Sequence, residues 1–178
     1  MSTQTVHHTS LVFSIPIFGP KGLQAGAKDP NKGAPTKERP RFGNGRVYTP
    51  SRTVVAEQMI RSAWVRAGSI KLPDGPVELE LTVCLRRPSS HLLASGALSA
   101  EGRRCPFPYG TKPDADNALK LVMDALNKHA WRDDVSVISS HVVKRWLRKG
   151  EVSRFIVSAR SLTVESLDAS IIGWEIGD

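Results

Sequence analysis

The chain has 178 residues, 40% of them hydrophobic, and a formal net charge of +8 at pH 7. This length suits one hydrophobic core and is short for two domains. No run approaches the roughly 18 apolar residues of a membrane span, and the first residues lack a secretory signal. We therefore expect a single-domain, soluble, intracellular protein. Its only cysteines, Cys84 and Cys105, match no zinc-binding or redox spacing and are interpreted as small apolar fillers.

The first predicted element is a strand at residues 11–18 (LVFSIPIF). Pro16 places this strand at a sheet edge, because proline has no amide hydrogen to donate within a sheet. Residues 19–45 are rich in Gly, Pro and Lys and show no periodicity, which predicts a long loop. Loops of this length are commonly functional.

The end of this loop is basic, with aromatic residues between the charges. Phe42 and Tyr48 could stack on bases or sugars while the basic side chains contact phosphates. A hairpin turned at residues 43–45, with ordinary surface arginines, is an equally good interpretation. The basic residues of this segment are Lys37, Arg39, Arg41 and Arg46.

From residue 51 the apolar residues recur at three- and four-residue spacing, which predicts a helix that ends at Gly68. Ser51 or Thr53 can cap its start. The expected core face comprises Val54, Val55, Met59, Ile60, Ala63 and Trp64. Residues 77–85 (VELELTVCL) then alternate apolar and polar, as in a strand with one buried face.

Two arginines, Arg86 and Arg87, leave this strand in the run RRPSSH. Residues 96–110 are predicted to be a second loop, which contains Arg103 and Arg104. A basic strand end is often simply solvated. Here it precedes an acidic stretch, so that it could face the same ligand.

The helix predicted after Pro113 is the best-specified local element. Asp116 or Asn117 is expected to cap it. Its core stripe comprises Leu119, Val122, Met123 and Leu126. Asp116, Lys120 and Asp124 lie four residues apart on another face, where the order of Asp before Lys is favourable. Asp124 is interpreted as a solvated residue of this face.

Two β-rich runs complete the predicted fold. Residues 135–146 and 152–162 are interpreted as a hairpin with Gly150 in its turn. Lys144 and Arg145 add to the basic surface. The tail at 163–178 is acidic and shows no readable function.

The stretch from 112 to 134 is acidic in an otherwise basic chain. Asp114 and Asp116 are one residue apart, and extended backbone would point both carboxylates to one side. Asp133 and Asp134 lie beyond a helix about 15 Å long. The second pair can therefore meet the first only if the intervening loop brings the next strand back.

Converging carboxylates repel one another, and a hard divalent cation, Mg²⁺ or Mn²⁺, would hold them together. Such an ion also bridges phosphate oxygens and activates water. Lys120 could orient that water or offset charge on the phosphate. A structural interpretation is equally open on spacing alone: Asp116 caps the helix, and Asp114 and Asp133–Asp134 form turns.

The run K-P-D-A-D-N-x-x-K, followed by D-A-L-N and W-R-D-D, resembles the signature of the RusA family of Holliday junction resolvases, found widely in bacteriophages and prophages. R-P-R-F, G-R-V-Y-T-P and R-R-P-S-S-H are also similar to segments of many members. The resemblance covers about residues 11–162. The loop at 19–45 and the tail beyond 162 depart from the compact form of the family.

This resemblance implies an α+β fold, with a mixed or antiparallel sheet packed with about two main helices. It also implies a Mg²⁺-dependent homodimer that nicks two strands of a four-way junction symmetrically, in recombination and repair, without a small-molecule cofactor. The expected location is the cytoplasm of a bacterial host. Carried over, the metal ligands fall on Asp114, Asp116 and Asp134, with Asp133 as a secondary candidate, and the essential lysine is Lys120.

The combined prediction is a metal-dependent endonuclease acting on branched DNA as a two-fold symmetric homodimer. One alternative is a DNA-binding protein without catalysis. Another is a glycosyltransferase that uses Asp-Ala-Asp as a D-x-D motif, which the positive charge and the lack of a clear βαβ half disfavour. The candidate DNA-contacting residues are Lys37, Arg39, Arg41, Arg46, Arg86, Arg87, Arg103, Arg104, Lys144 and Arg145.

Overall fold

The computed structural model describes residues 9–16, 37, 40–43 and 46–163. The strands are β1 (Ser10–Pro16), β2 (Arg41–Gly43), β3 (Arg46–Tyr48), β4 (Val77–Leu85), β5 (Val137–Trp146) and β6 (Arg154–Ser161). The helices are α1 (Ser51–Arg66), α2 (Ala100–Arg104) and α3 (Ala115–Leu126), with single 3-10 turns at Ser89–His91 and Asp134–Ser136. The predicted loop at 19–45 and the tail from 164 fall largely or wholly outside the described residues.

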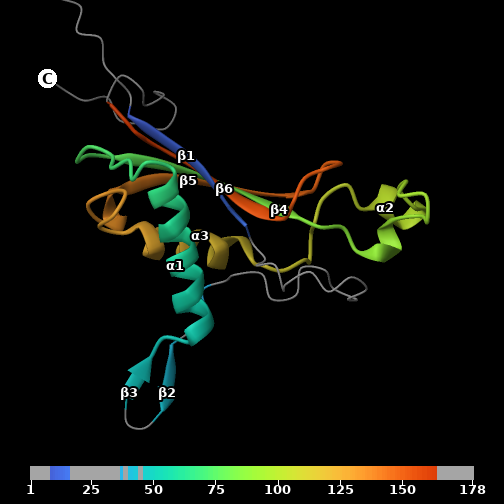
Figure 1. Cartoon of the computed structure of the whole chain (residues 1–178), viewed down its shortest axis with the longest axis horizontal. Helices are drawn as coiled ribbons and strands as arrows, with labels where there is room; N and C mark the ends of the chain where they lie inside the picture. Colours follow the sequence, from blue (N-terminus) through green and yellow to red (C-terminus); the bar gives the residue numbers. More distant parts are fainter. Residues whose placement is uncertain (1–8, 17–36, 38–39, 44–45, 164–178) are drawn as a thin grey trace, which may run out of the picture.

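Four strands form one mixed sheet in the order β1-β6-β4-β5 (Figure 1). β6 is antiparallel to both β1 and β4, and β5 is parallel to β4. β1 pairs with β6 at one edge of the sheet, as Pro16 predicted. The sheet and its helices confirm the predicted α+β class with a mixed sheet.

The predicted hairpin of β5 and β6 is wrong, because β4 lies between these two strands. β4 is the most deeply buried strand, with Val77, Leu79 and Val83 fully covered. Burying it requires a partner along each edge, and the alternation pattern of a strand does not specify which partner that is. β4 and β5 are instead parallel and connected through α3, a strand–helix–strand unit that the sequence did not reveal.

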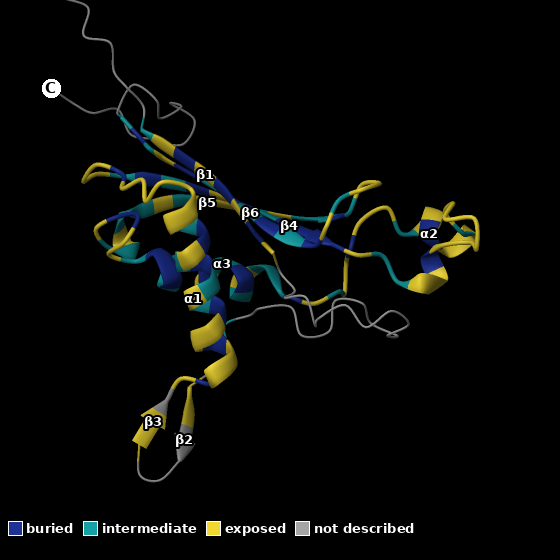
Figure 2. Cartoon of the chain, viewed as in Figure 1, coloured by how far each residue is buried: buried dark blue, intermediate teal, exposed yellow. Residues whose placement is uncertain are grey.

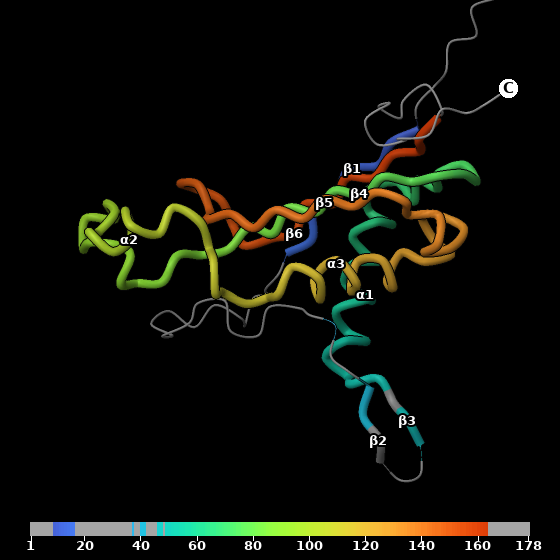
Figure 3. The backbone as a smooth tube through the Cα atoms, turned by 180° about the vertical axis from the view of Figure 1, so that it is seen from behind, coloured from blue at the N-terminus to red at the C-terminus, as the bar shows by residue number. Residues whose placement is uncertain are grey.

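Both long helices lie on one face of the sheet (Figures 1 and 3). The core between them contains Leu79 and Leu81 of β4, Phe155 of β6, Ile60 of α1 and Leu121 of α3. Burial of each such side chain is worth roughly 1.5–3 kcal/mol. The covered face is dark blue along the inner sides of the helices and the sheet in Figure 2. This core fixes α3 as a rigid support for the polar residues on its other side.

The core face of α1 differs from the predicted one. Val54 and Val55 are 37% and 54% exposed, whereas Thr53 and Ala56 are buried. Thr53, Ala56, Ile60 and Ala63 form the buried stripe, and its small residues allow α1 to approach its neighbours closely. No side chain caps α1; the carbonyl of Pro50 accepts from the amide of Thr53 at 3.0 Å.

Residues 86–111 form a projection from the end of the sheet, which we call the lobe (Figure 1). It contains α2, where the sequence predicted only a loop. Ser99 caps α2, its Oγ accepting from the amide of Gly102 at 3.1 Å. A Cβ on Gly102 would meet the carbonyl oxygen of His91 at 2.2 Å, so this close approach requires glycine.

The structure also bears on the cysteines and on membrane-spanning segments. Cys84 is buried and Cys105 partly buried, and both are free thiols. Among the described residues, no helix has the length and apolar character needed to cross a membrane.

Candidate active site

α3 carries Asp116 and Lys120, and it begins at Ala115, two residues earlier than a cap at Asp116 would require. Asp114 is its N-cap, with extended backbone (φ −68°, ψ 143°), and its carbonyl accepts from the amide of Ala118 at 3.0 Å. The helix includes Ala115 because alanine is the strongest helix former. Asp116 therefore lies in the first turn, where the positive end of the helix dipole stabilises its charge.

The buried side of α3 is continuous, which determines where its polar side faces. The buried residues are Ala118, Leu121, Val122, Ala125 and Leu126. Leu119 and Met123, predicted to be in the core, are partly buried against it. Asp116 and Lys120 are exposed on the opposite side, one turn apart. The helix thus presents this carboxylate and this ammonium group to solvent together.

The first carboxylate pair is Asp114 and Asp116. Lys112 Nζ lies 2.6 Å from Asp114 Oδ2, and the side chain of Asp114 remains 48% exposed. The hydrogen bond from Lys112 holds the pKa of Asp114 below its ordinary value, and Asn117 and Lys144 contribute to the lowering. Asp114 is therefore ionised at neutral pH and open to solvent.

Past the end of α3 the chain reverses through a tight turn. The carbonyl of Leu126 accepts from the amides of His129 and Ala130, both at 2.9 Å, and Lys128 adopts a positive φ of 63°. The turn buries the Trp131 side chain completely. The buried indole is therefore held in one orientation, from which it can position the carboxylate of Asp134.

The second carboxylate pair is Asp133 and Asp134, in a different environment from the first. Trp131 Nε1 donates to Asp134 Oδ1 at 3.2 Å. Burial raises the pKa of Asp134 above its ordinary value, and the charges of Asp124 and Asp133 add to the rise, while hydrogen bonds from Trp131 and Asn127 oppose it. Asp133 caps the short turn that follows, its Oδ1 accepting from the amide of Val135 at 3.2 Å.

The turn brings Asp134 towards the far end of α3 rather than towards its start. Its charged neighbour there is Asp124, eight residues after Asp116, or about 12 Å along the helix axis. In the part of the chain that the structure describes, no group of three or more Asp, Glu, His or Cys residues could hold a metal ion. The oxygen ligands suit Mg²⁺ chemically, but one described chain does not gather them into a three-ligand site.

The basic segment before α1 is described in part. Arg41 and Arg46 are exposed on the β2–β3 hairpin, which projects beyond the start of α1 (Figure 1). Arg39, the turn at 44–45 and the side chains of Phe42 and Tyr48 lie outside the described residues. Lys37 is engaged within the protein: its Nζ lies 2.6 Å from Asp124 Oδ2 and 3.0 Å from Glu57 Oε1.

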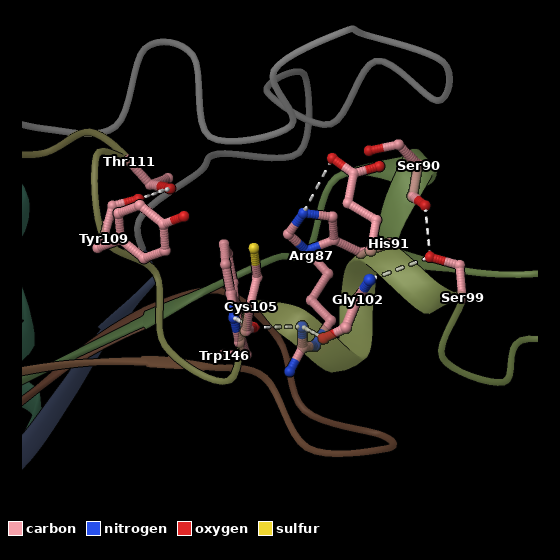
Figure 4. Close-up of polar contacts among 10 residues, drawn as sticks. Arg87, Ser90, His91, Ser99, Gly102, Cys105, Tyr109, Thr111 and Trp146 are labelled. Atoms are coloured by element: carbon pink, nitrogen blue, oxygen red, sulfur yellow. Dashed lines mark hydrogen bonds and ion pairs between the residues drawn. The ribbon is translucent and has the colours of Figure 1, made fainter.

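Arg87 is also engaged, at the base of the lobe (Figure 4). Its Nη1 donates to the carbonyls of Gly102 at 3.1 Å and Cys105 at 3.0 Å, and its guanidinium lies 5.1 Å from the Trp146 ring centroid. Trp146 Nε1 donates to the same Cys105 carbonyl at 3.0 Å, and His91 meets the Trp146 ring edge-on. Arg87 thus holds the lobe to the end of β5.

The remaining candidate DNA-contacting residues divide similarly. Arg86, Arg103 and Arg104 are all exposed, and Arg103 Nη1 donates to the carbonyl of Leu98 at 2.7 Å. Lys144 Nζ donates to the carbonyl of Thr111, and burial lowers its pKa. Arg145 makes two contacts with Glu151, at 2.5 and 2.8 Å. The hydrogen bond from Arg145 lowers the pKa of Glu151 to about 2.

Sequence reasoning missed the residues that position the site. Trp131 is the first residue of the motif W-R-D-D, and its place three residues before Asp134 is a signal that the sequence contains. No such signal marks the ion pairs of Glu57 and Asp124 with Lys37, or the hydrogen bond from Trp146 to Cys105, because the partners are distant in the sequence.

A protein-family model described as Endodeoxyribonuclease RusA matches residues 32–155 of the chain. The matched range contains both carboxylate pairs, Lys120 and all the candidate DNA-contacting residues. A comparison with curated proteins gives no match.

Proposed function

Because the chain belongs to the RusA family of endodeoxyribonucleases, which resolve Holliday junctions, we propose that it cuts four-way DNA junctions by paired symmetric nicks. The proposal includes a requirement for Mg²⁺, with Mn²⁺ as a substitute, a two-fold symmetric homodimer, and action in the cytoplasm of a bacterium that hosts a phage or prophage. The proposal also holds that both carboxylate pairs are required for cutting, although one described chain does not bring them into a single metal site.

The observation that carries the proposal is the exposed side of α3. Asp116 in the first turn and Lys120 one turn later face solvent on a helix whose other side is rigidly packed. Lys112 keeps Asp114 ionised beside them. A phosphate approaching this end of α3 would meet an ammonium group that can offset the negative charge developing on its oxygens.

Asp134 contributes a differently tuned carboxylate. Its position is set by the indole of Trp131, which is fully buried and therefore held in one orientation. A partly buried carboxylate with a raised pKa binds a proton more readily than Asp114 does. The pKa values of Asp114 and Asp134 are therefore shifted in opposite directions by their surroundings.

Homodimer formation follows from the substrate. Two nicks at symmetric positions need two active sites related by the symmetry of the junction, and a two-fold homodimer supplies them. The net charge of +8 favours binding of a polyanion of this size. The exposed basic residues that would lie nearest to the junction arms are Arg41 and Arg46 on the hairpin and Arg86 and Arg104 on the lobe.

One assay tests the proposal. Labelled four-way, flap, fork and linear duplex DNAs are incubated with the protein with and without Mg²⁺, and both incisions are mapped. We expect paired nicks at symmetric positions in the four-way junction, and cutting that stops when EDTA removes the metal. Binding without any cutting would favour a non-catalytic DNA-binding protein, and equal cutting of linear duplex would exclude junction resolution.

A further inference from the structure

Lys37 connects parts of the chain that are far apart in sequence. Its Nζ contacts Glu57 Oε1 of α1 at 3.0 Å and Asp124 Oδ2 of α3 at 2.6 Å. Its backbone amide also donates to the carbonyl of Asn117 in the first turn of α3, at 3.4 Å. Glu57 has a second cation, Arg61, 3.8 Å away on its own helix. Lys37 therefore bridges the two long helices from a segment outside both.

The bridge is more enclosed than an ordinary surface ion pair. The side chains of Lys37, Glu57 and Asp124 are 20%, 16% and 28% exposed. Reduced contact with water strengthens the attraction between the charges, and one ammonium satisfies two carboxylates. Removing Lys37 would take the ammonium away from both carboxylates, of which Glu57 would still have Arg61 3.8 Å away.

The bridge lies beside the candidate active site. Asn117, Lys120 and Asp124 fall at i, i+3 and i+7 of α3 and therefore share one stripe of the helix. The backbone amide of Lys37 contacts Asn117 and its Nζ contacts Asp124, so that Lys37 lies along the stripe that carries Lys120.

Lys37 also lies just ahead of the β2–β3 hairpin. β2 begins at Arg41, four residues after Lys37, and β3 leads through Pro50 into α1. The hairpin projects away from the helices and carries Arg41 and Arg46 (Figure 1). In the sequence, the hairpin therefore lies between the Lys37 bridge and the start of α1.

We propose that Lys37 is a positioning residue for the DNA substrate: through Glu57 and Asp124 it fixes the β2–β3 hairpin relative to α3. This inference rests on the proposed function, because it assigns Lys37 a role in holding the same junction. It replaces the phosphate contact that the sequence predicted for Lys37. Asp124, interpreted from the sequence as a solvated residue, becomes an acceptor of the bridge.

Lys37 could contact a DNA phosphate directly or could position the hairpin through Glu57 and Asp124. These two roles predict opposite effects on DNA binding when the two carboxylates are neutralised. Glu57→Gln/Asp124→Asn removes two negative charges near a bound polyanion, which by electrostatics alone would strengthen DNA binding. If Lys37 acts through these carboxylates, the same variant releases the hairpin and weakens binding.

The experiment uses the full chain and a labelled four-way junction. The variants are Lys37→Met, Lys37→Arg, Glu57→Gln/Asp124→Asn and the triple combination, with Lys71→Met as a matched exposed-lysine control. Junction affinity is measured over a range of salt concentrations, KM and kcat are measured for cutting, and thermal unfolding confirms that each variant folds.

We expect Lys37→Met and the acceptor variant each to weaken junction binding and raise KM by about threefold to tenfold, with kcat within about twofold of wild type. The triple variant should be no worse than Lys37→Met, and Lys37→Arg should bind like the wild type. The salt slope should stay unchanged, since no phosphate contact is lost.

Two results would overturn the inference. One is a salt slope reduced by about one in Lys37→Met together with undiminished binding by the acceptor variant, which indicates a direct phosphate contact. The other is Lys37→Met binding as tightly as Lys71→Met. The proposed function fails by a different result, namely a wild type that does not cut the junction, and the binding series still reports on the bridge in that case.

Discussion

The two ends of α3 present carboxylates in contrasting surroundings. At the first end, Asp114 is half exposed, paired with Lys112 at 2.6 Å, and has a lowered pKa. At the other end, Asp134 is partly buried, hydrogen-bonded by the Trp131 indole, and has a raised pKa. The same side-chain chemistry is thus tuned in opposite directions by what surrounds it.

This contrast indicates different tasks for the two ends. The first end is open and stays charged, so that it can meet a substrate from solvent. The second is held by a buried ring in a fixed place. If both ends serve one reaction, changes at either end should affect cutting, and they should differ in their effects on stability.

The largest expected effect comes from the first end. Asp116→Asn and Lys120→Ala should each reduce junction cutting by about a hundredfold or more, because each removes a charged group at the exposed reaction surface. Junction affinity should change little. Single-turnover cutting and gel-shift binding measure the two quantities, with Glu80→Gln, an exposed carboxylate of β4, as control. A Lys120→Ala variant that cuts at the wild-type rate would remove this lysine from the reaction.

A smaller effect is expected from the residue that orients the second end. Trp131→Phe keeps a buried ring but removes the hydrogen bond to Asp134, which should slow cutting by about tenfold at unchanged junction affinity. The matched control is Trp146→Phe, which removes an indole hydrogen bond to the carbonyl of Cys105 in the lobe. Equal rates for both variants would show that Trp131 does not position Asp134.

A still smaller effect, on stability, is expected in the lobe, which precedes Lys112 and Asp114 in the chain. Arg87→Ala removes two hydrogen bonds to carbonyls and the contact with Trp146, and should lower the free energy of unfolding by about 1–3 kcal/mol. Arg104→Ala, an exposed neighbour on the lobe, should change it by less than about 0.5 kcal/mol. Denaturant unfolding measures both. Equal stability of the two variants would contradict a structural role for Arg87.

The smallest effect concerns pH and differs in sign between the ends. Asp114 has a lowered pKa, so its stabilisation is complete above the ordinary value of 3.8 and is lost as the pH falls through the folded-state pKa. Asp134 has a raised pKa, so its charged form costs stability at neutral pH and this cost disappears as the pH falls towards 3.8. Asp114→Asn should therefore destabilise the protein at pH 7 and Asp134→Asn should stabilise it. Shifts of the same sign in thermal unfolding would contradict the contrast.

Local patterns in the sequence predicted much of this fold. The alternation at 77–85 and the helical spacing after Pro113 gave β4 and α3 with correct types and nearly correct bounds. Strand pairing was not predictable in the same way, since the position of β4 between β5 and β6 depends on contacts across the whole chain. Which side of α1 is buried likewise depends on tertiary packing, because small residues such as Ala56 and Ala63 let the helix lie close to α3 and β1.

The candidate site shows the same division. The motif that contains Asp116 and Lys120 identified the exposed side of α3, because these two residues lie one turn apart on that helix and Asp114 is its N-cap. The partners of Lys37 and Arg87 were not predictable, because a basic side chain in a sequence carries no sign of whether it faces solvent or a carboxylate of another element. The interpretation of such cations as DNA contacts therefore required the structure.

The central claim, that both ends of α3 act in one reaction, is tested most directly at Asp134. Asp134→Asn should bind a four-way junction as the wild type does, yet cut it at least about a hundredfold more slowly in Mg²⁺ under single-turnover conditions. This loss should accompany the increase in stability predicted above, which would exclude misfolding as its cause. Cutting by Asp134→Asn at the wild-type rate would contradict the account.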